Sequence, residues 1–257
     1  MVMPNLGRSV QMDSLHADWL SERSKGEHAI RVWASQHLNI QIGVGTPDDG
    51  WRGADFWAAQ ADETLTLDEL IARSEVATIG IDGGGLDDLL GLCVIGRERE
   101  TRRWLIWNHA FVHPKVLELR KDIAANLNDF DQEGSLTFAE VPDDVGQLVD
   151  IIFRVFQAGL LPEKNAIGID PNNVAAIIEA LALAGIPDAM LHRLRQGPAL
   201  APALWGLERK LSDGTAVHSG LALMAWCVGN VKVERKGNSA MATKQAAGSA
   251  KIDPFIA

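Results

Sequence analysis

Three aspartates stand where their carboxylates could bind metal ions together. Asp82 directly follows the β-branched run 76–81, and Asp170 directly follows the apolar run 166–169. Asp253 stands at the head of a predicted C-terminal helix. Hard divalent cations prefer carboxylate oxygens, and two such cations about 4 Å apart, held by converging carboxylates, hydrolyse phosphodiesters. If the strands 76–81 and 166–169 are neighbours in one sheet, Asp82 and Asp170 face the same crevice.

Each of these aspartates also has a purely structural interpretation. Asp82 precedes three glycines, so the role of its side chain could be purely structural, to hold a tight turn. Asp170 and Asp253 are each followed by proline, which is typical of a helix N-cap and its first helical residue. For either Asp-Pro pair taken alone, the N-cap interpretation is favoured. The interpretation as metal ligands therefore depends on further features of the sequence.

The elements that position these aspartates are predicted from apolar periodicity and turn-forming residues. The strand 76–81 is followed by two further predicted strands, 89–95 and 104–112. A charged turn joins these two, so an antiparallel meander is expected. The segment 236–250 is rich in Gly, Ser, Ala and Lys and is predicted to be a mobile loop. Further strands are predicted at 136–141, 166–169 and 231–234, and helices at 66–74, 114–126, 143–158, 172–184, 199–210 and 220–228.

The composition is that of an ordinary globular protein. Its 257 residues are 47% hydrophobic, enough to bury a full core, and no uncharged apolar run reaches the length of about 18 residues that a membrane span needs. Cys93 and Cys227 stand in apolar surroundings and are predicted to be core residues in a reducing compartment.

The net charge of −10 has the wrong sign for bulk attraction to nucleic acid. Phosphate contacts need only a local basic stripe. The candidates for such a stripe are Arg97, Arg99, Arg102, Arg103, Arg193, Arg195, Lys232, Arg235, Lys236, Lys244 and Lys251.

The string Gly-Ile-Asp-Gly-Gly-Gly-Leu-Asp-Asp-Leu at 80–89 resembles the first nuclease strand and hairpin of tailed-phage large terminases. In that family an aspartate at the strand end is followed six residues later by a second aspartate and a leucine. Here these aspartates are Asp82 and Asp88. Three later motifs also resemble the family and occur in the same order along the chain. The first is Gly-Ile-Asp-Pro-Asn-Asn at 168–173, and the last is Lys-Ile-Asp at 251–253. Between them lie the spaced residues His218, Gly220, Trp226 and Asn230.

The resemblance implies a fold and a division of the chain. The fold is α/β, with an RNase H-like mixed sheet flanked by helices at 65–257 and an N-terminal helical connector segment at 1–64. Within the connector, Pro-Asn-Leu-Gly at 4–7 and His-Leu-Asn at 37–39 resemble the segment that leaves the ATPase motor. No Gly-x-x-x-x-Gly-Lys-Ser/Thr loop occurs, so no ATP site is expected in this chain.

The resemblance also implies an activity. Asp82, Asp170 and Asp253 would be the catalytic residues and the ligands of two Mg²⁺ or Mn²⁺ ions in an endodeoxyribonuclease. That enzyme would cut concatemeric viral DNA during genome packaging into capsids. The implied partners are double-stranded DNA, the small terminase subunit, the capsid portal protein and further copies in a homo-oligomeric full-length motor, with no membrane. The implied location is the host bacterial cytoplasm, and the implied source is a bacteriophage or prophage.

Other residues of the resemblance have structural interpretations. Asp88 could pair with a hairpin neighbour or lie near the site. Trp226 and Asn230, four apart on a helix, are predicted to give core packing and a helix-end contact, and His218 could be a turn residue. The chain also departs from the family, because the glycines 83–85 replace its Ser or Thr, and Leu221, Ala222 and Ala225 replace its Asn, Pro and Arg.

Two other classes of function remain open at this point. The string Asp82-Gly83-Gly84-Gly85 also resembles the first phosphate loop of actin-like-fold sugar kinases, although Asp87 and Asp88 add negative charge where phosphates would lie. The third class is a catalytically inactive structural or docking domain whose acids serve as caps. Stabilisation by Mn²⁺ would distinguish a metal site from an inactive domain, because a ligand that binds only the folded state stabilises that state.

Overall fold

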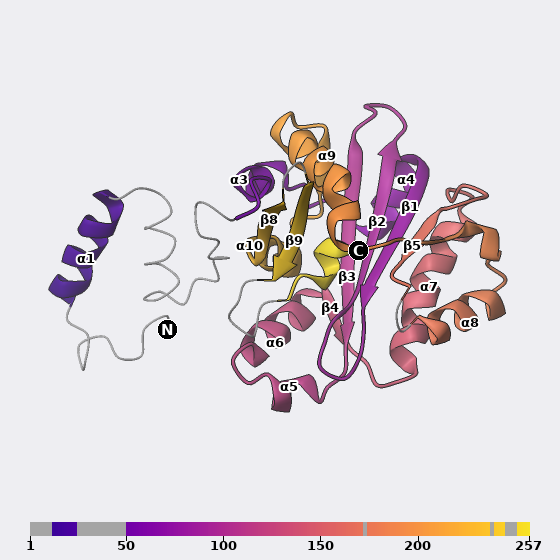
Figure 1. Ribbon diagram of the computed structural model, residues 1–257, viewed down its shortest axis with the longest axis horizontal. Coiled ribbons are helices and arrows are strands. Elements are labelled where there is room, and N and C mark those ends of the chain that lie inside the picture. The colour runs from indigo at the N-terminus through magenta and orange to yellow at the C-terminus, as the bar shows by residue number, and fades with distance from the viewer. Residues whose placement is uncertain (1–11, 25–49, 172–173, 237–238, 245–250) are drawn as a thin grey trace.

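Seven strands form one mixed sheet within residues 12–24, 50–171, 174–236, 239–244 and 251–257, which the computed structural model describes (Figure 1). These strands are β1 (Ser74–Gly83), β2 (Leu90–Glu98), β3 (Trp104–Val112), β4 (Leu136–Phe138), β5 (Ile167–Ile169), β6 (Leu191–Arg193) and β7 (Ala216–His218). Their order across the sheet is β4, β3, β2, β1, β5 and β6, and β7 also pairs with β3.

The first three strands form the predicted antiparallel meander. Side chains alternate between the two faces of the sheet, as the pleat requires. Ile79 and Leu92 pack on one face, and Cys93 and Ala110 pack on the other. The strand β5 then adds to β1 in parallel, and β6 adds to β5 in parallel. The sheet is therefore mixed, with a change from antiparallel to parallel pairing at β1.

Helices cover both faces of this sheet, and Figure 1 shows α7 and α8 on the side opposite α9 and α10. One face packs against α4 (Leu67–Arg73), α7 (Asp143–Gln157) and α8 (Ala175–Leu183). The other face packs against α3 (Ala54–Trp57), α5 (Val116–Leu119), α6 (Ala124–Glu133), α9 (Ala201–Ser212), α10 (Ala222–Gly229) and α11 (Asp253–Ile256). The remaining helical segments among the described residues are α1 (Met12–Ser24) and the 3-10 turns Ala58–Gln60, Asp188–Met190 and Gly197–Leu200.

Several helix ends follow the signals in the sequence. The hydroxyl of Thr66 accepts the backbone N–H of Glu69 at 3.2 Å and so caps α4, as predicted. The helix α7 begins at Asp143 and is followed by Gly159, whose positive φ of 71° lets the chain leave the helix. The predicted helix 143–158 is therefore confirmed within one residue.

The predicted single helix at 114–126 is wrong. The chain forms the short α5, leaves helical geometry at Arg120 and then begins α6. At this break the guanidinium of Arg120 donates to the carboxylate of Asp87 at 2.7 and 2.6 Å. A local pattern could not show this interruption, because the partner of Arg120 lies in a distant turn.

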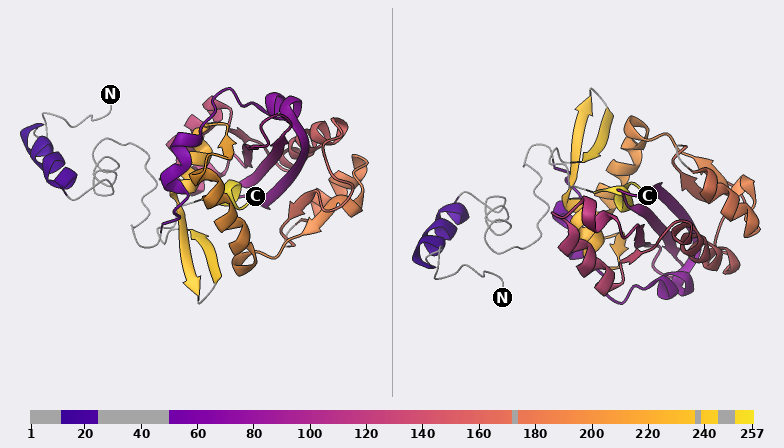
Figure 2. Two further views of the ribbon diagram at one scale, coloured as in Figure 1. Left: turned by 90° about the horizontal axis from the view of Figure 1, so that it is seen from above. Right: turned by 90° about the horizontal axis from the view of Figure 1, so that it is seen from below.

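The prediction of a mobile loop at 236–250 is wrong over the part that the structure describes. The strands β8 (Val231–Lys236) and β9 (Ser239–Lys244) form an antiparallel hairpin with a regular register. Figure 2 shows this hairpin running outward beside α9. Small side chains such as Ala240, which is 1% exposed, let β9 pack closely without the apolar periodicity that predicts a strand.

Part of the predicted connector packs on the sheet domain. Trp51 is buried and its ring lies edge-on to Phe255, with centroids 4.8 Å apart. The chain also forms a bridge between Gly50 and Lys232. The motifs at 4–7 and 37–39 lie outside the described residues, so the boundary at residue 65 stays a prediction. No helix in the described part of the chain is long and apolar enough to cross a membrane.

Candidate metal centre

Asp82 and Asp170 extend neighbouring strands at the same edge of the sheet. The strands β1 and β5 are parallel, and Ile81 pairs with Ile169. The next residue on each strand is one of the two aspartates, so both carboxyl groups leave the sheet at the same level. The sequence-based condition for the two aspartates to face one crevice, that their strands are neighbours, is met.

Asp253 reaches the same place from the C-terminal side, as the first residue of α11. This short helix packs across β1 and β2 where both strands carry glycine. A Cβ atom on Gly91 would lie 2.6 Å from the backbone nitrogen of Pro254. One on Gly83 would lie 2.1 Å from the carbonyl oxygen of Leu89 and 3.1 Å from Cβ of Asp253. Gly83 also has a positive φ of 83°. Glycine at these two positions is what allows Asp253 to approach β1.

A substitution at Gly91 tests this close approach. We expect Gly91→Ala to destabilise the fold by about 1–3 kcal/mol, because the added methyl group would lie 2.6–2.8 Å from three backbone atoms of α11. Urea unfolding measures the change.

The matched control is Gly146→Ala in α7, where nothing lies within 4 Å of the added Cβ atom. That change should stabilise the protein by up to about 1 kcal/mol, since alanine favours a helix over glycine. Equal effects of the two substitutions would contradict the packing of α11 on β2.

Four aspartates line one cavity of about 460 Å³ at this edge of the sheet. Asp88, from the turn between β1 and β2, joins Asp82, Asp170 and Asp253. The other lining residues are Gly83, Gly84, Gln196, Gly197, Leu200, Ala242, Thr243, Lys244, Ile252 and Ile256. The three aspartates singled out from the sequence are therefore brought together, and Asp88 lies with them.

Asp253 is the most buried of the four carboxyl groups, at 4% exposure. One carboxylate oxygen, Oδ1, lies 3.4 Å from Nζ of Lys244, and the other, Oδ2, is buried without a hydrogen-bond partner among the described residues. Burial raises the pKa of Asp253 to about 7, and the negative charges of Asp88 and Asp82 add to this increase. A buried carboxylate oxygen with no partner is costly unless a cation binds it.

Asp82 is in a similar position. Burial raises its pKa to about 6, and the charge of Asp170 adds to the increase, although a hydrogen bond from Gln196 opposes it. The side-chain amide of Gln196 donates to Oδ1 of Asp82. Both raised pKa values have the same origin, which is negative charge held in a poorly solvated cavity.

Lysines supply part of the missing positive charge. Lys251 is buried and donates to the Asp88 carboxylate at 2.7 Å and to the backbone carbonyl of Asp87 at 2.6 Å. Burial would raise the pKa of Asp88, but the hydrogen bond and charge of Lys251 and the charge of Lys244 lower it. Lys251 therefore holds the β1–β2 turn against the segment that carries Asp253.

The donor set fits a divalent cation, although the described residues contain no group of three or more His, Cys, Asp or Glu side chains already placed to hold a metal ion. Four carboxyl groups share the cavity with the ammonium of Lys244, and within the described part of the chain one carboxylate oxygen has no hydrogen-bond partner. Oxygen ligands of this kind match Mg²⁺ and Mn²⁺ rather than a softer metal.

Three residues of the resemblance lie outside the cavity and have structural roles. His218 lies in β7, where its ring stacks on Trp57 with centroids 3.8 Å apart and its Nε2 lies 2.8 Å from the Trp57 carbonyl oxygen. Trp226 packs against Phe130, and Asn230 caps α10 and donates to the carbonyl of Lys251 at 3.4 Å. The predictions of core packing and of a helix-end contact are confirmed.

Four of the candidate basic residues lie at the opposite end of the sheet. The turn between β2 and β3 is distant from Asp82, because Asp82 pairs with Gly91 at the far end of β2. There Arg102 pairs with Glu75, and Arg103 lies 3.4 Å from Glu98. Arg97 stacks on the ring of Trp104. Arg99 donates to the backbone carbonyl of Ser74. These residues stabilise the hairpin and do not line the cavity.

Sequence reasoning missed two contributors to the cavity. Gln196 follows the edge strand β6, and β6 itself was not predicted because its three residues carry no alternating pattern. Lys244 was named only as a candidate phosphate contact within a loop, whereas the end of β9 places it beside Asp253 and Asp88. Neither position has a local signal, since both depend on pairing between distant segments.

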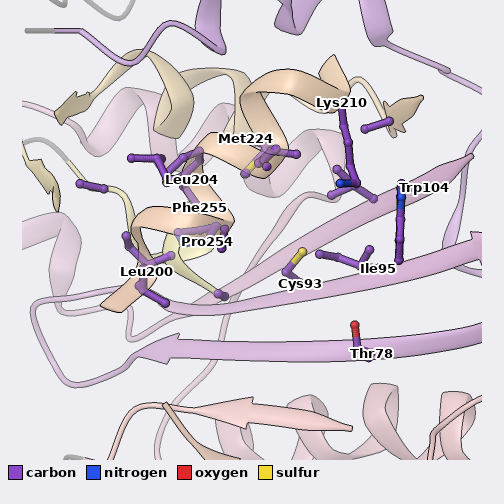
Figure 3. Close-up of a pocket in the computed structure, with 18 of the residues that line it drawn as sticks. Thr78, Cys93, Ile95, Trp104, Leu200, Leu204, Lys210, Met224, Pro254 and Phe255 are labelled. Carbon is purple, nitrogen blue, oxygen red and sulfur yellow. The ribbon is translucent and has the colours of Figure 1, made fainter. Parts of the chain in front are cut away.

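An apolar cavity of about 370 Å³ lies behind the aspartates. Figure 3 shows Leu200 and Leu204 near Pro254 and Phe255, to one side of Cys93 on β2. The buried amide of Asn108 donates to the Pro254 carbonyl at 3.0 Å and so ties α11 to β3. Leu200 lines both cavities, so apolar packing directly supports the aspartate cavity.

Comparison with solved structures identifies phage large terminases. The HK97 bacteriophage large terminase has a TM-score of 0.62 and 17% identity over 99% of this chain and 50% of that chain. The large terminase nuclease from thermophilic phage G20c with bound magnesium has a TM-score of 0.47 and 13% identity over 81% of this chain and 93% of that chain. The g2p (large terminase) nuclease domain from bacteriophage SPP1 with bound Mn has a TM-score of 0.41 and 18% identity over 77% of this chain and 92% of that chain.

No protein-family model and no curated protein matches the sequence. The chain spans half the length of the HK97 large terminase structure that it matches. At 17% identity, this match establishes the fold. The predicted mixed sheet flanked by helices is confirmed, and the chain has the fold found in the matched half of the HK97 bacteriophage large terminase.

Proposed function

We propose that this chain is the nuclease part of a phage or prophage large terminase, a divalent-metal-dependent endonuclease that cuts double-stranded DNA. One observation carries the proposal: Asp82 and Asp170 end neighbouring parallel strands in the cavity where Asp253 keeps a buried oxygen without a described partner. The likeness of the fold to phage large terminases supports it.

Asp82, Asp170 and Asp253 would hold two Mg²⁺ or Mn²⁺ ions as ligands. When bound, such ions lower the pKa of water and stabilise negative charge on the scissile phosphate and the leaving oxygen. The protein's own part is to hold its carboxylates in place and to keep the apolar side of the cavity dry. Gln196 orients the Asp82 carboxylate, and Asn108 fixes the helix that carries Asp253.

The biological setting belongs to the same proposal. The substrate would be concatemeric viral DNA, cut during genome packaging in the host bacterial cytoplasm. The small terminase subunit and the capsid portal protein would direct the place of cutting, and further copies of the chain would assemble in the full-length motor. Residues 1–64 would connect the nuclease domain at 65–257 to an ATPase motor domain.

DNA would lie along the edge strand β6. Arg193 pairs with Ile169, the residue before Asp170, and Arg195 precedes the cavity residue Gln196. Both arginines are exposed. Removing both side chains (Arg193→Ala with Arg195→Ala) is expected to weaken DNA binding and to reduce the slope of log affinity against log salt by about 1 per lost phosphate contact.

Fluorescence anisotropy with a DNA duplex in Ca²⁺, at several salt concentrations, measures that slope. The control is Lys164→Ala, an exposed cation before the opposite end of β5. If the double variant keeps the wild-type slope, DNA does not contact this edge.

The kinase alternative has weaker support. The turn after Asp82 carries Asp87 and Asp88, and these acids are already paired with Arg120, Lys251 and Lys244. The turn itself carries no cation that could bind a phosphate, since residues 84–89 contain no Lys or Arg. The inactive-domain alternative predicts neither cleavage nor stabilisation by metal.

Incubation of the protein with supercoiled plasmid in Mn²⁺, in Mg²⁺ and in EDTA tests the proposed function. We expect nicked and linear products with metal and none with EDTA. A folded protein that leaves the plasmid supercoiled under all three conditions would overturn the proposal.

A further inference from the structure

Lys244 lies between two carboxylates of the cavity. Its Nζ atom is 3.4 Å from Oδ2 of Asp88 and 3.4 Å from Oδ1 of Asp253. The hairpin fixes its backbone, because Lys244 pairs with Val231, which is 1% exposed, and the carbonyl of Val231 accepts the N–H of Trp51. The ammonium is therefore delivered to the cavity by a regular element of the fold.

The two lysines of this region differ in how firmly they are held. The side chain of Lys251 is 5% exposed and makes two short hydrogen bonds, one of them to backbone. The side chain of Lys244 is 41% exposed, and both of its carboxylate contacts exceed the usual hydrogen-bond length. Lys251 is a fixed structural cation, whereas Lys244 makes electrostatic contacts that a stronger cation can replace.

Lys244 and the two aspartates that it contacts all line the cavity where a divalent ion would bind. A divalent cation carries twice the charge of the ammonium, so it interacts more strongly with the same oxygens. Asp253 has a second buried oxygen without a described partner, and one ammonium does not satisfy both. Lys244 and a divalent ion carry charge of the same sign and repel each other, so the ammonium loses its place beside Asp253 when an ion binds that carboxylate.

We propose that Lys244 is a built-in counter-ion that competes with the divalent metal for Asp253, and that metal binding displaces its ammonium from the cavity. This inference rests on the proposed metal centre and assigns a further residue to it. Lys244 keeps the carboxylates together in the metal-free protein and lowers the apparent metal affinity. In this role it is a positioning residue.

Titration calorimetry with Mn²⁺ on the whole chain tests the inference. Lys244→Met removes the charge and keeps the length of the side chain, so Mn²⁺ should bind at least about fivefold more tightly than to wild type, because no ammonium has to be displaced. Lys244→Arg keeps the charge and should show no increase. The matched control is Arg235→Met, an exposed cation on β8 of the same hairpin.

The outcomes separate this inference from the proposed function. Wild-type protein that binds Mn²⁺, together with an unchanged or lower affinity in Lys244→Met, would overturn the counter-ion role and leave the metal centre standing. Equal gains in Mn²⁺ affinity in Lys244→Met and Arg235→Met would also overturn the counter-ion role, since they would reflect the overall positive charge of the hairpin. Wild-type protein that binds no Mn²⁺ would overturn both proposals. Urea unfolding of each variant shows whether the fold is intact.

Discussion

Asp82→Asn is expected to reduce the rate of metal-dependent plasmid cleavage by more than about 100-fold, because it removes a charged ligand from the metal centre. Asparagine keeps the size of the side chain and can still contact Gln196, which donates to this position in the wild type. The fold should therefore persist. The rate at which supercoiled plasmid disappears at saturating Mn²⁺ measures the effect.

Asp253→Asn is expected to have the same effect, since Asp253 shares the cavity. The matched control is Asp213→Asn, an exposed aspartate after α9 that accepts hydrogen bonds from Thr215 and does not line the cavity. Cleavage at near wild-type rate by Asp82→Asn would remove this residue from the catalytic set. A comparable loss in Asp213→Asn would show that the assay responds to general damage.

Asp82 and Asp253 are expected to destabilise the metal-free protein increasingly as the pH rises from 5 to 8. The folded-state pKa values of Asp82 and Asp253 are raised from the ordinary value of 3.8 to about 6 and about 7. A raised pKa contributes stability that is complete below the unfolded value and is lost as the pH rises through the folded value. For each carboxyl group the loss between pH 5 and pH 8 is on the order of 1–3 kcal/mol.

Urea unfolding in EDTA measures this loss as a difference between wild type and Asp253→Asn. The difference is needed because burial lowers the pKa of His109 and His218, so these two groups add stability as the pH rises toward 6.5. The asparagine variant should gain on wild type as the pH rises. With saturating Mn²⁺, wild type should instead become more stable toward pH 8, because the metal binds the ionised carboxylates. A constant difference across this range would mean that Asp253 is not held in a poorly solvated cavity.

The part of the fold that the sequence predicts is the part with local patterns. Apolar runs that end in an acid located β1 and β5, and glycine after an amphipathic segment located the end of α7. Because the two runs are parallel neighbours, the residue after each one reaches the same cavity, and this placed Asp82 and Asp170 together. Strand ends are predictable because the alternation of side chains is local, whereas strand neighbours are set by the whole fold.

The part that the sequence did not predict depends on contacts between distant segments. Lys244 lies in a hairpin with no apolar periodicity, and Gln196 follows a strand of three residues. From the sequence alone, the glycines at 83–85 indicate only that the hydroxyl groups of the family are missing here. The structure gives Gly83 a physical role, since its positive φ and its missing side chain leave room for the Leu89 carbonyl and for Asp253.

Isothermal titration of the wild-type chain with Mn²⁺, alongside the double variant Asp82→Asn with Asp253→Asn, is the most direct test of the metal centre. Saturable binding by wild type, lost or weakened by more than about 100-fold in the double variant, is the predicted result. Equal Mn²⁺ binding by the two folded proteins, or no binding by wild type, would contradict it.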